Sequence, residues 1–283
     1  MKAIRTVKKI FSSVPTLEGA GVHLKRGFGY HQVPELDPFL LLDDFHSSNP
    51  ADYVAGFPWH PHRGIETISY ILKGFVEHGD SMGNKGVIGE GDVQWMTAGS
   101  GIIHQEMPKG MKDGRLWGFQ LWANLPASHK MMAPRYQEIK APRIPEVCLA
   151  DGVNVKVICG TVNEVQGPVR DIVTDPEYLD VAMPASSVFK HTVKTGHTVF
   201  AYVIEGHACF SDGKADIGVE TVVLFGDGDS LKITAGSEGA RFLLVSGRPL
   251  GEPVAWYGPI VMNTEKELEI ARRELSDGTF LKG

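Results

Sequence analysis

Short segments in which apolar and polar residues alternate follow one another along most of the chain, separated by turns that contain glycine. Because successive side chains of a strand point to opposite faces, this pattern predicts half-buried β-strands. A continuous apolar run at residues 39–42, between Pro38 and the acidic pair Asp43-Asp44, predicts a fully buried strand. The other predicted strands are 22–26, which we expect at a sheet edge, and 67–72, 75–78, 93–96, 116–123, 153–159, 199–204 and 219–225. Short strands at this spacing indicate an all-β fold, an antiparallel sandwich or barrel.

The alternation loosens between residues 133 and 145, where three prolines lie among charged residues. We therefore predict a domain junction there, with one domain over residues 1–135 and another over 136–283. A weak internal repeat supports this division, because residues 69–74 (SYILKG) resemble residues 201–206 (AYVIEG). Two copies of one fold would explain the repeat.

One segment near the carboxyl end has the signals of a helix. Thr264 and Glu267 form a capping-box pattern, and the apolar residues Leu268, Ala271 and Leu275 follow at helical spacing before Asp277-Gly278. We assign this short helix to the second domain and expect it to pack against a sheet.

Composition and charge narrow the range of functions. The 283 residues are 42% hydrophobic and 22% charged, which is typical of a soluble globular protein, and the net charge of -6 leaves no excess of cations for direct nucleic-acid binding. We find neither the apolar core of an export signal nor an apolar run long enough to span a membrane. Cys148, Cys159 and Cys209 are too widely spaced for a disulfide framework, so we expect free thiols and a cytoplasmic protein.

Two pairs of residues carry the candidate chemistry. His60 and His62 lie two apart in a segment that continues into a predicted strand, so their side chains point the same way if the segment is extended. His104 and Glu106 repeat this spacing about forty residues later. Imidazole and carboxylate groups are ligands of first-row transition metals, so these two pairs together predict a metal site.

A second carboxylate competes for the same role. Glu66 shares the parity of His60 and His62 and would face the same ion along an unbroken strand, whereas a bulge at Arg63-Gly64 would turn it away. The residues alone leave open whether Glu66 or Glu106 is the fourth ligand.

Several motifs together resemble the pirin family of the cupin superfamily. They are residues 36–45, 57–70, 91–99, 104–108, 120–126 and 258–264, so the resemblance extends over the whole chain. It implies a bicupin of two antiparallel β-barrels of the jelly-roll type, with a metal ion held in the amino-terminal one by His60, His62, His104 and Glu106. Glu66 would then support the site without binding the metal. The second half has no matching histidine pair, only His197 and His207 ten residues apart in that region, so its domain is expected to be metal-free.

The resemblance also implies an activity, a metal-dependent dioxygenase of the quercetin 2,3-dioxygenase type that acts with O2 on a flavonol or similar enediol. Glu106 would accept the proton of the substrate hydroxyl, and Phe57, Trp59, Trp95 and Met96 would supply apolar walls. Fe(II) is the expected ion, although nickel, manganese, cobalt, copper and zinc accept such ligands.

A regulatory function is the alternative, in which an iron-dependent redox sensor acts through protein partners as a transcription coregulator or a modulator of metabolic enzymes. Isomerase chemistry on phosphorylated sugars is disfavoured, because no cluster of arginine and lysine accompanies the ligands to hold a phosphate.

Overall fold

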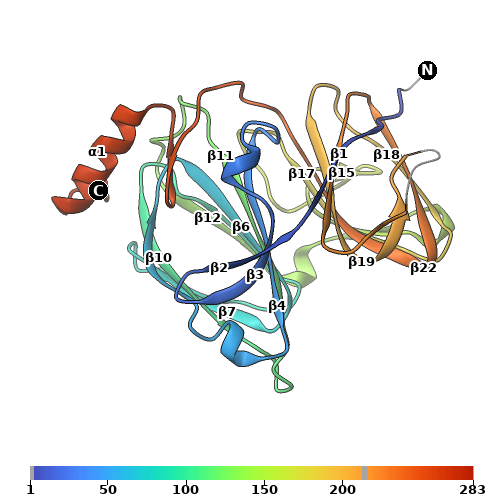
Figure 1. Cartoon of the computed structure of the whole chain (residues 1–283), viewed down its shortest axis with the longest axis horizontal. Coiled ribbons are helices and arrows are strands. Elements are labelled where there is room, and N and C mark those ends of the chain that lie inside the picture. The colour runs from blue at the N-terminus through green and yellow to red at the C-terminus, as the bar shows by residue number, and fades with distance from the viewer. Residues whose placement is uncertain (1–2, 212–215, 283) are drawn as a thin grey trace. The chain divides into compact units, whose positions relative to one another are not determined.

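The computed structural model describes residues 3–211 and 216–282, and β-strands dominate these residues (Figure 1). Neighbouring strands run antiparallel, as in the pairs formed by β11 with β4 and by β17 with β22. The predicted all-β class is therefore confirmed. The sheets are open sandwiches rather than the closed barrels we expected, since the end strands of a sheet do not pair with each other.

The described chain divides into two compact units, and neither is continuous in sequence. The first unit comprises Val14–Glu35, Phe39–Ala141 and Leu250–Gly283, and the second comprises Met1–Ser13, Leu36–Pro38 and Pro142–Pro249. These limits differ from the domains that we predicted at residues 1–135 and 136–283. The amino-terminal segment Met1–Ser13 belongs to the second unit, which the second half of the sequence mainly forms. The carboxyl-terminal segment Leu250–Gly283 belongs to the first unit, which the first half mainly forms.

Two sheets build the first unit. The larger one has the strand order β12-β9-β6-β11-β4-β3-β2, and the smaller one the order β5-β10-β7-β8. The strands of the larger sheet are β2 (Val14–Glu18), β3 (Val22–Phe28), β4 (Phe39–Ser47), β6 (Ile65–Lys73), β9 (Val93–Thr97), β11 (Leu116–Asn124) and β12 (Arg135–Ile139). Those of the smaller sheet are β5 (Phe57–His62), β7 (Phe75–Asp80), β8 (Lys85–Ile88) and β10 (Ile102–Lys109).

Two predictions for this unit were wrong. The strand predicted at residues 22–26 is not an edge strand, because β2 pairs with its outer side. The stretch that appeared irregular from residue 133 contains β12, which pairs with β9 from Arg135 to Ile139. The prolines of that stretch flank the strand instead of interrupting it.

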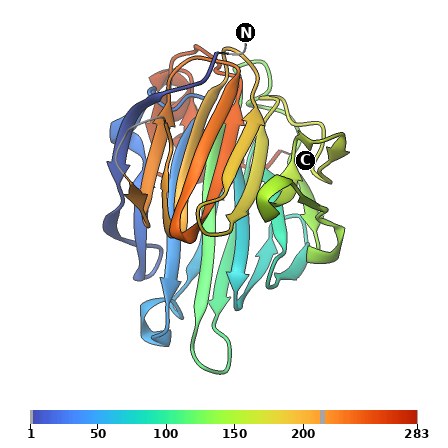
Figure 2. The ribbon, with the colours of Figure 1, turned by 90° about the vertical axis from the view of Figure 1, so that its right-hand side faces the viewer.

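In the second unit, a sheet with the order β1-β21-β19-β22-β17-β14-β13 surrounds an apolar interior. The long strand β22 pairs with β18 near its start and with β17 near its end, and Figure 2 shows these yellow to orange strands lying side by side. The strands of this unit are β1 (Val7–Ser12), β13 (Glu146–Cys148), β14 (Asn154–Cys159), β15 (Thr161–Val162), β16 (Val165–Gln166), β17 (Glu177–Met183), β18 (Val188–Thr192), β19 (Thr198–Cys209), β20 (Ile217–Gly218), β21 (Thr221–Phe225) and β22 (Ser230–Gly247), of which β15 and β16 pair as a separate two-stranded sheet.

The carboxyl-terminal segment adds a hairpin and a helix to the first unit. The hairpin consists of β23 (Ala255–Tyr257) and β24 (Ile260–Met262), and α1 (Glu265–Ser276) follows it. The predicted capping box is confirmed, since the Thr264 side chain accepts from the Glu267 N–H while the Glu267 carboxylate accepts from the Thr264 N–H. The helix packs through Leu268 and Ala271, although we had assigned it to the second domain.

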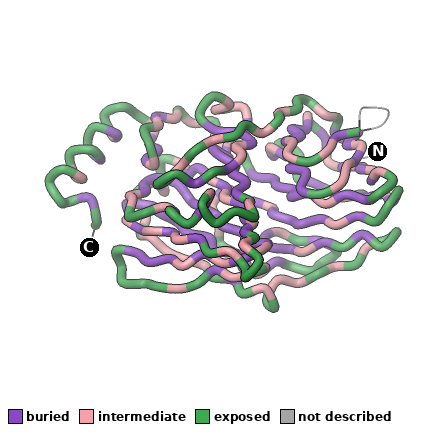
Figure 3. The backbone as a smooth tube through the Cα atoms, turned by 60° about the horizontal axis from the view of Figure 1, so that its bottom comes forward, coloured by how far each residue is buried: buried purple, intermediate pink, exposed green. Residues whose placement is uncertain are grey.

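Short 3-10 turns complete the regular structure at η1 (Tyr30–Gln32), η2 (Pro50–Asp52), η3 (Ala141–Arg143) and η4 (Ala150–Gly152). Burial follows the strands, and Figure 3 shows buried purple segments within the sheets and exposed green segments at the loops. None of the described helices has the length and apolar character required to cross a membrane.

Candidate metal centre

Three histidines meet on the smaller sheet of the first unit. His60 and His62 lie on β5 and His104 on the adjacent strand β10, where His104 and His60 are direct cross-strand partners. Strand β5 is at the edge of this sheet, which allows it to contain Pro58 and Pro61 without disrupting the sheet. Strand alternation then directs both of its histidines to the same face, as predicted.

The imidazole Nε2 atoms converge on one point. Nε2 of His60 is 3.0 Å from Nε2 of His62 and 3.0 Å from Nε2 of His104. The three nitrogens lie within 4.8 Å of one another, and His62 and His104 are buried. Two nitrogens that bind one ion at right angles, each about 2.1 Å from it, would be about 3.0 Å apart, so the two 3.0 Å separations fit pairs of ligands to a single first-row metal ion.

The Nδ1 atoms of two of these imidazoles donate hydrogen bonds, which favours metal binding through Nε2. Nδ1 of His60 donates to the Pro58 carbonyl at 2.8 Å, and Nδ1 of His62 donates to the Pro259 carbonyl at 3.1 Å. A proton on Nδ1 leaves the lone pair of Nε2 free for a metal. Burial, reinforced by the neighbouring imidazoles, lowers the pKa of His62 and of His104 well below the usual histidine value, which favours the neutral, ligating form.

Glu106 lies beside this histidine cluster. Its Oε2 atom is 4.0 Å from Nε2 of His104 and accepts a hydrogen bond of 2.9 Å from Gln120, while its Oε1 atom accepts one of 3.1 Å from Ser69. Ser69 and Gln120 are cross-strand partners on β6 and β11, so the larger sheet fixes the carboxylate from one side. Glu106 is thus held within a short movement of the histidines, and its role as the fourth ligand stays a prediction.

Glu66 points to the opposite face of the larger sheet. It lies an odd number of residues from Ser69 on β6, and its Oε1 atom accepts a hydrogen bond of 2.7 Å from Thr97. The parity that linked it to the histidines is lost because β5 ends at His62 and β6 starts at Ile65 in a different sheet, with Gly64 at a φ of 77° between them. Burial raises the pKa of Glu66, an effect that the hydrogen bond from Thr97 partly offsets.

A cavity of about 600 Å³ opens beside His60 and His62. Its aromatic lining is Tyr30, Phe57, Trp59, Trp122 and Trp256, and Leu41, Pro58 and Pro259 add apolar surface. The polar side chains at its wall include Arg26, Asp43 and Gln120. The dimensions and lining suit a flat, partly hydroxylated ring system.

Two of the four residues that we predicted to line this cavity do line it. Phe57 and Trp59 line it, but Trp95 and Met96 do not, because both are fully buried on β9, with Met96 in the apolar core. Trp122 and Gln120, which we had not selected, lie two apart on β11 and therefore share a face. That parity is the signal by which the sequence could have revealed them.

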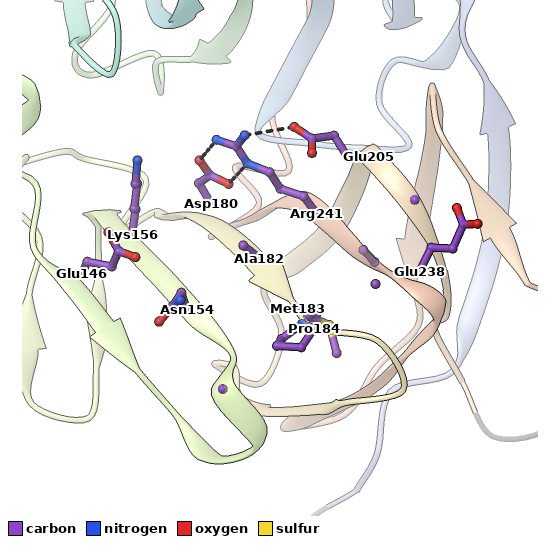
Figure 4. Close-up of a pocket in the computed structure, with 14 residues that line it drawn as sticks. Glu146, Asn154, Lys156, Asp180, Ala182, Met183, Pro184, Glu205, Glu238 and Arg241 are labelled. Atoms are coloured by element: carbon purple, nitrogen blue, oxygen red, sulfur yellow. Dashed lines mark hydrogen bonds and ion pairs between the residues drawn. The ribbon is translucent and has the colours of Figure 1, made fainter.

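The second unit has a cavity of similar volume but of a different character. Its walls carry the charged side chains of Glu146, Lys156, Asp180, Glu205, Glu238 and Arg241. Figure 4 shows Arg241 between Asp180 and Glu205, and its guanidinium binds both oxygens of Asp180 at 2.9 and 2.7 Å. Among the described residues, the histidine cluster of the first unit is the group of three that meets metal-ligand spacing. The metal-free state of the second domain stays a prediction.

Comparison with known proteins agrees with this geometry. The Pirin family model matches residues 21–123, and the model of the pirin C-terminal cupin domain matches residues 178–281. A pirin-like protein of Caulobacter vibrioides is 45% identical over 98% of this chain and 99% of its own length. A Pseudomonas aeruginosa protein that is provisionally named a quercetin 2,3-dioxygenase is 42% identical over 99% of both chains.

Solved structures give the same fold. The crystal structure of a quercetin 2,3-dioxygenase from Acinetobacter baumannii superposes with a TM-score of 0.90 at 32% identity, covering 98% of this chain and 99% of that one. The two units therefore correspond to two cupin domains, which confirms the bicupin prediction. The chain belongs to the pirin family.

Proposed function

We propose that this protein is a metal-dependent dioxygenase of the quercetin 2,3-dioxygenase type, which opens the ring of a flavonol or similar enediol with O2 and releases carbon monoxide. One observation carries the proposal: the Nε2 atoms of three histidines converge, two of these histidines line an aromatic cavity, and a buried carboxylate lies beside them. The names of the related Pseudomonas and Acinetobacter proteins support the same reaction class.

In this proposal His60, His62, His104 and Glu106 hold one divalent ion, most simply Fe(II), although the same ligands accept nickel, manganese, cobalt, copper or zinc. Neutral imidazoles leave much of the positive charge of the ion uncompensated, so the centre favours an anionic oxygen donor. A bound redox-active ion would supply the electronic link between O2 and an electron-rich substrate.

The residues of the chain have separate tasks around that ion. Trp122 and Trp256, whose rings are 5.9 Å apart, would support a flat substrate within the cavity. Glu106 would accept the proton of the hydroxyl that approaches the centre, and Ser69 and Gln120 keep its carboxylate oriented for that transfer.

The regulatory alternative uses the same centre differently, because a redox sensor would change its binding to a protein partner without consuming a substrate. The cavity favours the enzyme, since a sensor requires no space of about 600 Å³ beside its ligands. A cytoplasmic location stays part of the proposal, and no disulfide joins Cys148, Cys159 or Cys209.

The direct test is anaerobic purification with metal analysis, followed by loading with Fe(II) and measurement of O2 uptake and carbon monoxide release against a flavonol panel. We expect one metal per chain and equal amounts of O2 consumed and carbon monoxide formed. The His62→Ala variant should lose both metal and turnover. Equal O2 uptake by wild type and His62→Ala would overturn the proposal.

The role of Glu106 is tested against Glu66 as a matched control, because both carboxylates are buried in the same unit. We expect Glu106→Gln to lower kcat by about 100-fold or more, the usual contribution of a general base. Glu66→Gln should retain the metal and change kcat by less than about threefold. Metal loss in Glu66→Gln together with full metal content in Glu106→Gln would exchange the two roles.

A further inference from the structure

We propose that the β23–β24 hairpin (Ala255–Met262) supports the metal centre. The hairpin positions His62 and forms one wall of the substrate cavity. This inference rests on the proposed metal centre. It adds a positioning device formed by a segment that lies far from the ligands in sequence.

The hairpin reaches the centre at its turn. The Pro259 carbonyl accepts the hydrogen bond of 3.1 Å from Nδ1 of His62, although 197 residues separate them. Without this acceptor nothing in the observed contacts would hold the proton of His62 on Nδ1, and a proton on Nε2 would block metal binding. The hairpin therefore selects the ligating tautomer of a buried histidine.

The same hairpin contributes Trp256 to the cavity. The Trp256 ring lies 5.9 Å from Trp122 and 5.7 Å from Tyr30, and its Nε1 atom donates to the Gly258 carbonyl at 2.7 Å. Trp122 in turn packs edge-on against His62 at 5.1 Å. An aromatic wall thus runs from a ligand to the hairpin, and Trp256 limits the size of the ring system that fits.

Two buried cations hold the hairpin and the following helix in place. Lys130 donates to the carbonyls of Gly64 and Val261, each at 3.0 Å, so a single ammonium joins the turn after His62 to β24. Arg63 donates to the Phe280 carbonyl at 2.7 Å and forms an ion pair of 2.7 Å with Glu274 on α1. Both cations are only 1% exposed, which is costly for a charge unless it is well paired.

Gly64 allows this close approach. It has a φ of 77°, and a Cβ atom built there would lie 2.0 Å from the Val261 carbonyl oxygen, well inside van der Waals contact. Any larger residue at position 64 must push β24 away, and Pro259 moves with it. Gly83 provides a matched control, since its φ of 88° imposes similar backbone strain but nothing lies within 4 Å of the added carbon.

The experiment compares Gly64→Ala and Gly83→Ala by long-range ¹H–¹⁵N NMR of the histidine side chains in metal-free protein, and by Co(II) titration followed through its visible spectrum. For wild type and Gly83→Ala we expect a single His62 tautomer protonated on Nδ1. For Gly64→Ala we expect mixed tautomers and a Co(II) affinity lower by about 10- to 100-fold, the usual effect of removing the partner of a ligand. Equal Co(II) affinity in the two variants, or a wild-type His62 protonated on Nε2, would overturn the positioning role.

Trp256→Ala tests the cavity wall and does not depend on whether Gly64→Ala folds. Under nitrogen, with Zn(II)-loaded protein, we expect quercetin binding about tenfold weaker than in wild type and unchanged Zn(II) content. Unchanged quercetin affinity would exclude Trp256 from the wall. Because neither readout requires turnover, these results stay separate from those that test the dioxygenase activity.

Discussion

The interiors of the two cupin units differ at positions that the internal repeat aligns. Ser69 on β6 donates to Glu106, whereas Ala201, its counterpart on β19, lies in the apolar core of the second unit. The flanking positions match, since Tyr70 and Tyr202 are both fully buried and Gly74 and Gly206 both have positive φ. The two units thus share the backbone features of the repeat, but the side chains of Ser69 and Ala201, which face the two interiors, differ in polarity.

This difference shows how one fold serves two purposes. The second unit fills its interior with valine, leucine and phenylalanine side chains, which stabilise the fold through burial of apolar surface. The first unit instead faces imidazole, carboxylate, amide and hydroxyl groups toward one another, and each must find a partner to avoid a desolvation cost. The first interior is suited to chemistry and the second to stability.

The largest expected effect comes from opening a void in the apolar interior. Phe242 is fully buried on β22, with the Phe210 ring 5.4 Å away and the Phe189 ring 6.0 Å away. Phe242→Ala should lower the free energy of unfolding by about 3–5 kcal/mol in urea titrations, without changing the metal content of the folded protein. Loss of metal in the folded variant would show that the two interiors are not separate in function.

Exchanging the aligned residues Ala201 and Ser69 tests the difference between the two interiors. Ala201→Ser would bury a hydroxyl among apolar side chains and should lower the free energy of unfolding by about 1–3 kcal/mol. Ser69→Ala removes one of two donors to Glu106, so it should reduce kcat by about tenfold and stability by less than Ala201→Ser does. Urea unfolding and steady-state kinetics measure both, and a larger stability loss in Ser69→Ala would contradict the division of roles.

The smallest effect is a dependence on pH that belongs to the polar interior. Burial lowers the pKa of His62 and His104, whereas the unfolded chain binds these protons near pH 6.5, about the ordinary histidine value. Below that pH the unfolded state binds more protons, so the free energy of unfolding of the metal-free protein falls as the pH decreases toward the folded pKa values.

His104→Gln removes one of these groups and should reduce that slope by on the order of 1 kcal/mol per pH unit. Urea unfolding of the metal-free protein between about pH 5 and pH 7 measures it. A slope equal to that of wild type would mean that His104 is not a source of the acid sensitivity.

Local patterns predicted the fold class, most strands, the capped helix and the histidine cluster. Strand parity was sufficient for His60 and His62 because both lie on one uninterrupted strand. The same rule could not decide about Glu66, since Gly64 ends one strand and lets the chain enter another sheet. Parity is informative only within a strand, and where a strand ends depends on packing.

Several of the missed features depend on contacts between distant segments. No local pattern in the sequence singles out Lys130, which is buried against the carbonyls of Gly64 and Val261. Trp256 and Pro259 enter the site from a hairpin whose position no local pattern specifies. Trp95 and Met96 were chosen as walls for their apolar character, which describes a buried core residue equally well.

The hydrogen bond between His62 and Pro259 also cannot form until a late stage of synthesis. The two residues are 197 positions apart, and a ribosome that adds about 5–20 residues per second needs about 10–40 s to proceed from one to the other. During that interval the histidines have been made but the hairpin that orients one of them has not. In the proposed metal centre, the acceptor that orients His62 is therefore absent until residue 259 has been made, so we expect the nascent chain to bind the ion less tightly than the folded protein does.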